Sequence, residues 1–300
     1  MAVLIALKSV LAIAAPSKLF PVLKARKTKV LRAFLFCTAL FGTQNLYAVE
    51  CPALPIHQTV TVTQVIDGDT LRLADGRRLR LPTINTPELA REGNPEQALA
   101  LAAQLAVQSF LEDGNPQVGI SFGTRRQDRY GRLLAHVIHP SKGNLEAFLV
   151  AKGLAFPIPV PPDMTQATCL QDLAEQARRE GLGIWANDYW QALDVDELEN
   201  EQPAFRRVCG QINKVDAASG LWLETQGDLV FRITEQDSIY FNNSNFEISD
   251  AKSWPGKYLE AWGWLRDRRD QNDLIARGFK PWVLQVRTPY VLRWVQSCDQ

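Results

Sequence analysis

The chain has 300 residues, of which 46% are hydrophobic, and its 33 basic residues balance 33 acidic ones. This length and apolar content suffice for two folded domains and exceed what one small core covers. Residues 1–48 contain seven basic residues and no acid, so the rest of the chain has 26 basic and 33 acidic residues, a formal charge of −7. That charge excludes the strongly basic class of nucleic-acid binders, and any polyanion must be held by a few placed cations.

Residues 1–48 are typical of an export signal. The basic stretch KARKTKVLR precedes the apolar run AFLFCTALFG and the segment NLYAVE, with Ala48 as the expected last residue before cleavage. The apolar run is shorter than a comfortable membrane span. We therefore predict a secreted or periplasmic protein without stable membrane insertion after signal cleavage. A protein tethered to the membrane by an uncleaved signal is the alternative.

Four cysteines follow the signal, at positions 51, 169, 209 and 298. An even number in an exported chain favours disulfides, and no two are close enough in sequence for a CxxC zinc site. Three pairings are possible. We favour Cys51–Cys169 and Cys209–Cys298, because each pair would join the two ends of one predicted domain. Buried free thiols are the alternative.

The region after the first cysteine reads as three strands, a helix, two strands and two helices. A hairpin around Ala74-Asp75-Gly76 would set Leu71 opposite Leu79. The first helix is opened by Asn94 and Pro95, and the last two end at glycines. The predicted elements are strands at 58–65, 69–73, 77–81, 117–122 and 132–139 and helices at 96–113, 144–152 and 165–180. This order predicts a mixed α+β, mainly β domain in which antiparallel strands close into a small barrel supported by helices.

The domain boundaries follow from composition. Residues 49–186 form the first predicted domain, and 187–204 are rich in acids and predict a linker. Residues 205–300 contain about five strands separated by glycine-containing turns. This pattern predicts a second small β-rich domain, either a sandwich or an OB-like barrel.

Four short motifs occur in a fixed order: DGDT at 67–70, LRLPTINTPE at 79–88, DRYGR at 128–132 and GLA at 153–155. In this order and at these spacings they resemble the staphylococcal nuclease (thermonuclease-like) family, from about residue 59 to residue 185. The resemblance implies an OB-type five-stranded β-barrel with three helices. It also implies calcium-dependent hydrolysis of phosphodiester bonds in DNA or RNA.

The resemblance assigns roles to individual residues. Asp69 would be a Ca²⁺ ligand, and Thr86 would offer its backbone carbonyl to the same ion. Glu88 would position or deprotonate the attacking water. Arg80 and Arg132 would bind the scissile phosphate and stabilise the charge that builds in the transition state.

Further positions match the family in part. Asn85 stands where the family usually has a second calcium-binding aspartate, so we expect weaker metal binding. Asp67 is expected just outside the metal ligands, and Arg129 and Tyr130 match a Lys-Tyr pair that helps hold a terminal phosphate. After GLA the chain reads FPIPVPP, and Phe156 is the one aromatic residue left where the family has tyrosines that pack on a nucleotide.

The chemistry of these residues agrees with the assignment. Ca²⁺ prefers six or more oxygen ligands, which carboxylates, carbonyls and water supply. The chain has only three histidines, as expected for a site built from oxygens. Guanidinium groups match phosphate oxygens in a bidentate manner. Taken singly, however, an Asp-Gly pair is often just a turn.

The sequence is therefore compatible with two functions. The first is an exported, monomeric, calcium-dependent nuclease that acts on DNA or RNA without sequence preference. The second is a nuclease-like binding protein for nucleic acid or a cell-envelope polymer, without effective catalysis. In the second domain, Trp222, Trp262, Trp264 and Trp282 could stack on bases beside nearby arginines, but most of them are expected to fill a core.

Overall fold

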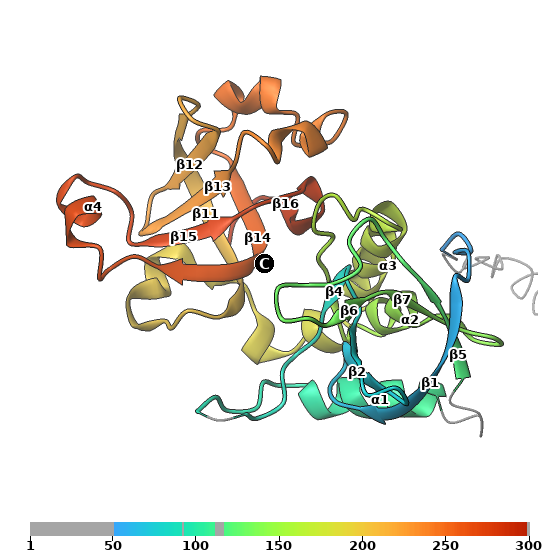
Figure 1. Ribbon diagram of the computed structural model, residues 1–300. Coiled ribbons are helices and arrows are strands. Elements are labelled where there is room, and N and C mark those ends of the chain that lie inside the picture. The colour runs from blue at the N-terminus through green and yellow to red at the C-terminus, as the bar shows by residue number, and fades with distance from the viewer. Residues whose placement is uncertain (1–50, 92, 112–116, 299–300) are drawn as a thin grey trace, which may run out of the picture. The chain divides into compact units, whose positions relative to one another are not determined.

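The computed structural model describes residues 51–298 except 92 and 112–116, and its fold is mixed α+β, as predicted (Figure 1). The predicted export signal, with Ala48, lies outside the described residues. No helix in the described part of the chain has the length and apolar character needed to cross a membrane.

The N-terminal sheet has the strand order β6-β3-β2-β1-β5-β7-β8. Its strands are β1 (Gln58–Val65), β2 (Thr70–Leu73), β3 (Arg78–Arg80), β5 (Gln117–Ser121), β6 (Leu133–Leu134), β7 (His136–His139) and β8 (Gly143–Asn144). Only Ala135 separates β6 from β7, and these two strands pair with opposite edges of the sheet, β6 with β3 and β7 with β5. The sheet therefore curls around a core made of the apolar faces of its strands.

The β2–β3 hairpin has the predicted register. Leu71 lies opposite Leu79 and Thr70 lies opposite Arg80, while Gly76 has a φ of +85° in the turn. Leu71 and Leu79 are fully buried. Because side chains alternate along a strand, this register directs Arg80 to the other face of the hairpin.

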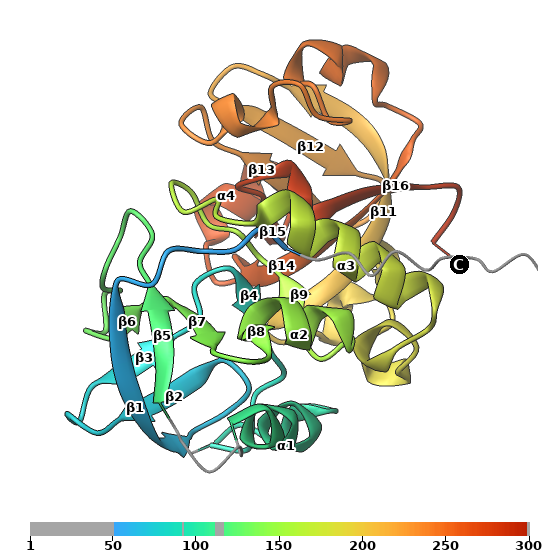
Figure 2. The same ribbon diagram turned by 90° about the vertical axis from the view of Figure 1, so that its right-hand side faces the viewer.

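Three helices support the N-terminal sheet: α1 (Ala100–Leu111), α2 (Leu145–Ala151) and α3 (Ala167–Arg179). Helices α2 and α3 lie side by side in Figure 2 and end before Gly153 and Gly181, both with positive φ, as predicted. The predicted start of the first helix, residue 96, was too early. Leu99 has a φ of +72°, and the preceding Gln97 pairs with Glu88, so the helix begins only at Ala100.

The C-terminal half forms a closed five-stranded barrel, as the strand count predicted. Its strands are β11 (Phe205–Asp216), β12 (Leu221–Thr225), β13 (Leu229–Ile233), β14 (Tyr258–Asp267) and β15 (Trp282–Gln285). They pair in the cyclic order β11-β12-β13-β15-β14-β11, in which β13 and β15 are parallel. The long strands β11 and β14 pair with each other and also with other neighbours, and this closes the barrel.

Shorter elements complete the chain. They are β10 (Leu193–Asp194), β16 (Leu292–Val295), α4 (Asn272–Ala276) and the 3-10 helices η2 (Gly183–Trp185), η3 (Asp188–Trp190), η4 (Val195–Asn200), η5 (Ser238–Phe241), η6 (Ile248–Ser253) and η7 (Pro289–Val291). In residues 187–204, the predicted linker, Trp190, Val195 and Leu198 are buried in the C-terminal core, and β10 pairs with β11.

An aromatic cluster joins the N-terminal domain to the C-terminal barrel. The ring of Phe156, which is completely buried, lies 5.1–5.4 Å from the ring centroids of Trp185, Trp190 and Phe205. Trp262 of β14 lies 6.4 Å from Phe156 and donates its indole N–H to the carbonyl of Pro157 at 2.9 Å. These contacts fix the strand β9 (Phe156–Pro157) between the N-terminal sheet and the C-terminal barrel.

Both predicted disulfides are confirmed: Cys51 bonds to Cys169, and Cys209 bonds to Cys298. The first ties the segment before β1 to α3, and the second ties β11 to the end of the described chain. Each bond joins parts of the chain about 100 residues apart, and in the chain-entropy view such long loops contribute about 4 to 5 kcal/mol each.

A buried polar network lies beneath the N-terminal sheet. His136 and Glu146 are 1% and 0% exposed, and their Nδ1 and Oε1 atoms are 2.8 Å apart. Thr83 donates its hydroxyl to the same carboxylate oxygen at 3.0 Å. Burial disfavours a charged imidazole, but the attraction of Glu146, aided by Asp163, outweighs it and raises the pKa of His136.

This pair makes stability depend on pH. A raised folded pKa means that the stabilisation is fully present below about pH 6.5, the ordinary pKa of histidine, and is lost as the pH rises through the raised value. We expect Glu146→Gln to lower the free energy of unfolding by about 1–3 kcal/mol at pH 6 and by less at pH 9. Urea unfolding at both pH values measures this difference.

The control is Glu175→Gln, which removes a more exposed pair with Arg178 and should cost less than about 1 kcal/mol at either pH. An equal loss for Glu146→Gln at pH 6 and pH 9 would contradict the assignment of the charged pair.

Candidate active site

The centre of the site is the ion pair between Asp69 and Arg80, whose Oδ1 and Nε atoms are 3.0 Å apart. The hairpin register produces it, because Arg80 lies opposite Thr70 and the N–H of Leu81 donates to the carbonyl of Asp69 at 2.9 Å. Asp69 is 2% exposed and Arg80 is 13% exposed at their side chains. The two predicted residues therefore meet in a largely dry environment, where charge pairing is strong.

The turn before β2 is shaped by a second buried acid. Asp67 accepts a hydrogen bond from the N–H of Asp69 at 3.1 Å, and its carboxylate also forms an ion pair with Arg91. Between the two acids, Gly68 has no space for a side chain: a Cβ there would lie 2.8 Å from the Cβ atoms of Thr86 and Ala103. The glycine thus allows the turn to pack directly against the next site segment.

That segment is β4 (Ile84–Asn85) with the residue that follows it. Thr86 donates its backbone N–H to Asp69 Oδ2 at 3.0 Å, and Asn85 Oδ1 lies 3.4 Å from Arg80 Nη2. Strand β4 pairs with β9, where Asn85 lies opposite Phe156. The position of Asn85 is thereby tied to the aromatic cluster.

Glu88 lies at the exposed side of this group. Its backbone pairs with Gln97 through both the N–H and the carbonyl, at 2.8 and 2.9 Å, and its Oε2 lies 3.7 Å from Arg91 Nη2. Partial burial and the charge of Asp69 raise the pKa of Glu88, although Arg91, Arg80 and Arg132 act in the opposite direction.

Asp67 has the largest perturbation in the site. Burial, together with the charges of Asp69 and Glu88, raises the pKa of Asp67 to about 7, against the opposing effects of the Asp69 backbone N–H and Arg91. Carboxylates held this close together cannot all ionise freely without a positive partner. Arg80 and Arg91 are these positive partners, and the raised pKa of Asp67 reflects the burial and repulsion that they do not offset.

Arg132 reaches the site from a separate turn over residues 128–132. Asp128 Oδ1 accepts the backbone N–H groups of Tyr130 and Arg132 at 2.9 Å each, and Asp128 Oδ2 lies 2.6 Å from Arg132 Nε. Gly131, with a φ of +75°, permits the tight turn. Burial alone would raise the pKa of Asp128. The hydrogen bonds from Arg132 and Tyr130 have the larger effect, so the pKa of Asp128 is lowered.

The structure brings most of the predicted residues together. Direct contacts join Asp67, Asp69, Arg80, Asn85 and Thr86, while Glu88 and Arg132 act on the group through their charges. Arg129 and Tyr130 lie on the solvent side of the Arg132 turn, where Arg129 donates to the Tyr130 hydroxyl at 2.5 Å and Arg132 lies 5.7 Å from the Tyr130 ring. Tyr130 is 63% exposed.

Phe156 does not belong to a binding surface. From the sequence, it was the one aromatic residue that could replace the family's nucleotide-packing tyrosines. Its ring is fully buried in the aromatic cluster, so it is not available to stack on a base. Three partners of the site were not predicted: Arg91, Gln97 and Asp128. Asp128 stands in the DRYGR motif four residues before Arg132, and this spacing was the available signal. Arg91 lies in an irregular segment with no periodic signal, and Gln97 was placed inside the helix predicted at 96–113, which begins only at Ala100.

The residues present fit a hard divalent cation. Around Asp69 the donors are carboxylate, amide and carbonyl oxygens, and the buried Thr86 hydroxyl has no hydrogen-bond partner. Across the described residues there is no cluster of three or more His, Cys, Asp or Glu side chains with metal-binding geometry. A cation here would therefore depend on Asp69, Asn85 Oδ1 and the Thr86 carbonyl.

Comparison with known proteins agrees with the motifs. Residues 78–187 match the family described as Staphylococcal nuclease homologue. The chain therefore contains a domain of this family, as the sequence predicted. The matched range includes Arg80, Glu88 and Arg132 and begins after Asp67 and Asp69.

Several endonucleases are similar to the same region. An uncharacterized endonuclease of Escherichia coli is 29% identical over 145 residues, which is 47% of this chain and 86% of the relative. Endonuclease YncB of Bacillus subtilis (strain 168) is 31% identical over 131 residues, 42% of this chain and 61% of the relative. The SPbeta prophage-derived endonuclease YokF of the same strain is 29% identical over 133 residues, 43% of this chain and 44% of the relative.

The close contact at Gly68 gives a test of the site's packing. In Gly68→Ala the added methyl group would press against Thr86 and Ala103, and overpacking of this kind costs about 1–3 kcal/mol. Urea unfolding measures the loss. The control Gly263→Ala adds a methyl group 3.3 Å from Leu284 in the C-terminal barrel and should destabilise the protein less. Equal stability of Gly68→Ala and the unaltered protein would contradict the close packing.

Proposed function

We propose that this protein is an exported, monomeric, Ca²⁺-dependent endonuclease that hydrolyses phosphodiester bonds of DNA or RNA without sequence preference. The observation that supports it most is the meeting of Asp69, Arg80 and Thr86 in one buried cluster with Glu88 at its edge. The family match and the similar endonucleases support a nucleic-acid substrate.

The arginines would bind the phosphate. Arg80 and Arg132 come from different segments, and Asp69 and Asp128 hold their Nε atoms at 3.0 and 2.6 Å. An arginine held in this way can present its outer nitrogens to phosphate oxygens in a fixed direction. The positive charge would oppose the negative charge that builds on the phosphoryl oxygens, and little reorganisation would be needed during the reaction.

Glu88 would act on the attacking water. Its backbone is fixed by Gln97, while its side chain is 48% exposed and can reach a water molecule. A carboxylate whose pKa is raised is a better proton acceptor than an ordinary one. A bound Ca²⁺ would add Lewis-acid stabilisation of a phosphoryl oxygen.

Export and the acidic body fit a degradative enzyme. Two disulfides in one chain are typical of proteins in an oxidising compartment, which supports the predicted secreted or periplasmic location with cleavage near Ala48. The formal charge of −7 after residue 48 favours weak binding and rapid release of a polyanion.

The test measures cleavage of single-stranded DNA and RNA by the purified, oxidised protein with Ca²⁺, with Mg²⁺ and with a chelator. We expect Ca²⁺-dependent cleavage that falls by about 10²–10³-fold in Arg132→Ala and strongly in Glu88→Ala. Arg206→Ala, which removes an arginine of the C-terminal barrel paired with Glu201, should leave the rate unchanged.

No cleavage with any metal, from a folded protein that still binds nucleic acid, would favour the second function, a binding protein without effective catalysis. Asn85 supports that alternative, because an amide supplies less negative charge to a cation than the usual aspartate. Recovery of cleavage in Asn85→Asp would identify this position as the cause.

Asp128 gives a separate prediction as a positioning residue. Asp128→Asn keeps the shape of the turn but removes the charge that holds Arg132, so we expect kcat to fall by less than in Arg132→Ala, with little change in melting temperature. The matched change Asp75→Asn removes an exposed pair with Arg77 and should not alter kcat. A loss confined to stability would contradict a positioning role.

A further inference from the structure

The C-terminal barrel has a pocket of about 560 Å³ that the proposed catalytic site does not use. It lies over the outer faces of β12 and β13 and is flanked by two connections. One joins β11 to β12 around Ala218 and Ser219, and the other joins β14 to β15 and carries α4, at the left of Figure 1. Closed five-stranded barrels of the OB type bind oligomers on the face of their second and third strands, between these two loops.

Two aromatic side chains line this pocket. Trp222, on β12, is half-buried, and Phe279, in the β14–β15 connection, is 39% exposed. The buried tryptophans differ from them: Trp262 and Trp282 are 1% exposed and fill the core, as expected. Trp264 is 50% exposed, but it lies at the end of the β11–β14 pairing against Phe205 and outside this pocket.

Arginines lie on both rings. Arg232, opposite Trp222 across the β12–β13 pair, has its guanidinium carbon 4.5 Å from the centre of the indole. Arg277 and Arg268 lie 5.2 and 6.0 Å from the centre of Phe279. Arg268 and Arg277 line the pocket together with both rings, and Arg232 lies beside it against Trp222. Surfaces that hold stacked bases and phosphates also combine aromatic rings with guanidinium groups.

These cations lack acidic partners. Within the described part of the chain no ion pair is formed by Arg232, Arg268, Arg277 or Lys280. The Nε atoms of Arg232 and Arg268 are buried without a hydrogen-bond partner. Burial and the repulsion of Arg232 lower the pKa of Arg268.

The two acids that line the pocket have partners that also line it. Glu224 pairs with Lys214 at 3.3 Å, and Asp216 accepts the backbone N–H of Ala218 at 2.9 Å. Two neighbouring arginines with unsatisfied nitrogens, in a body whose net charge is negative, indicate a site for an anion. The two aromatic rings that line the pocket favour an anion that also carries flat rings.

We propose that Trp222, Arg232, Arg268, Arg277, Phe279 and Lys280, here called the barrel pocket, form a second binding site for single-stranded nucleic acid. Single strands fit because their bases are free to stack on Trp222 and Phe279, whereas the base faces of a duplex are covered. The unpaired arginines would hold the phosphates. The site does not depend on cleavage by the N-terminal domain, and it would hold a strand while that domain acts.

The test measures fluorescence anisotropy of a labelled 15-residue oligo(dT) with the whole protein carrying Arg132→Ala, in chelator, so that cleavage is prevented. We expect Trp222→Ala to weaken binding at least about fivefold and Trp222→Phe to restore most of it. Lys280→Glu should also weaken binding and lower the salt dependence, by about 0.7 in the log–log slope per lost phosphate contact.

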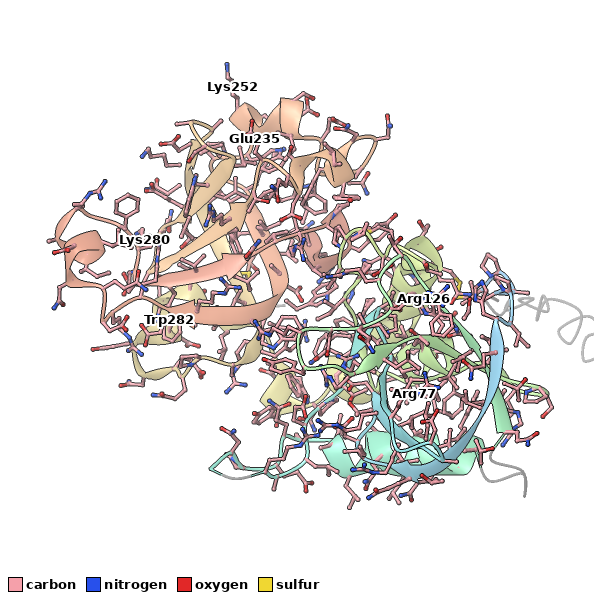
Figure 3. The ribbon with its side chains drawn as sticks, in the orientation of Figure 1. Arg77, Arg126, Glu235, Lys252, Lys280 and Trp282 are labelled. Atoms are coloured by element: carbon pink, nitrogen blue, oxygen red, sulfur yellow. A yellow bond between two sulfur atoms is a disulfide. The ribbon has the colours of Figure 1, made fainter. Side chains whose placement is uncertain are left out.

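Lys252→Glu is the matched control. It makes the same change of charge on the same barrel, and Figure 3 shows Lys252 and Lys280 well apart. It should leave oligo(dT) affinity within twofold of the parent. Melting temperatures of all variants verify folding, and the surface variant Lys280→Glu tests the site even if Trp222→Ala is unstable.

Two outcomes would overturn the proposal. Unchanged oligo(dT) affinity in both Lys280→Glu and Trp222→Ala would show that the strand binds elsewhere. Heparin that binds as tightly as oligo(dT), and loses affinity by the same factor in Trp222→Ala, would show a general polyanion site without base stacking. Either result leaves the cleavage test of the N-terminal domain unaffected.

Discussion

The buried ring of Phe156 is the contact on which both halves of the protein depend. Its strand pairs with β4, so that Asn85 lies opposite Phe156, while its ring packs against Trp185, Trp190 and Phe205. Large aromatic side chains dominate the energetics of such junctions, because each buries a large apolar area. The strand that carries Asn85 is therefore linked through Phe156 to the C-terminal barrel. The position that differs from the family's aspartate is also the position with this additional support.

The site itself is a balance of buried charges. Asp67 and Asp69 are each 2% exposed at their side chains, which would be costly for isolated carboxylates. Their partners Arg91 and Arg80 offset that cost, and the remaining repulsion appears as the raised pKa of Asp67 and of Glu88. Perturbed carboxylates that are held by arginines are common at functional sites, and this supports the proposed binding of a cation and a phosphate here.

Arginines are held differently in the N-terminal domain and in the C-terminal barrel. In the N-terminal domain the arginines are paired with Asp69 and Asp128, which orients them. In the barrel pocket Arg232 and Arg268 have no acidic partner among the described residues, although Arg268 donates to the carbonyl of Lys280, and both lie over or beside aromatic rings. Paired arginines suit a site that must fix one phosphate, whereas unpaired ones beside rings suit a surface that holds several nucleotides loosely.

The sequence by itself determined the hairpin register, the ends of α2 and α3 and the family motifs. These features depend on local alternation, on glycines with positive φ and on residue spacing, which are written in adjacent residues. For the disulfides the sequence favoured the observed pairing among three possible ones, and the structure decided it. The roles of Arg91 and Asp128, the burial of Phe156 and the arginines without acidic partners around Trp222 were decided only by the tertiary structure. Each of these depends on which distant segments pack together, and no local pattern encodes the distance between two charges on separate strands or turns.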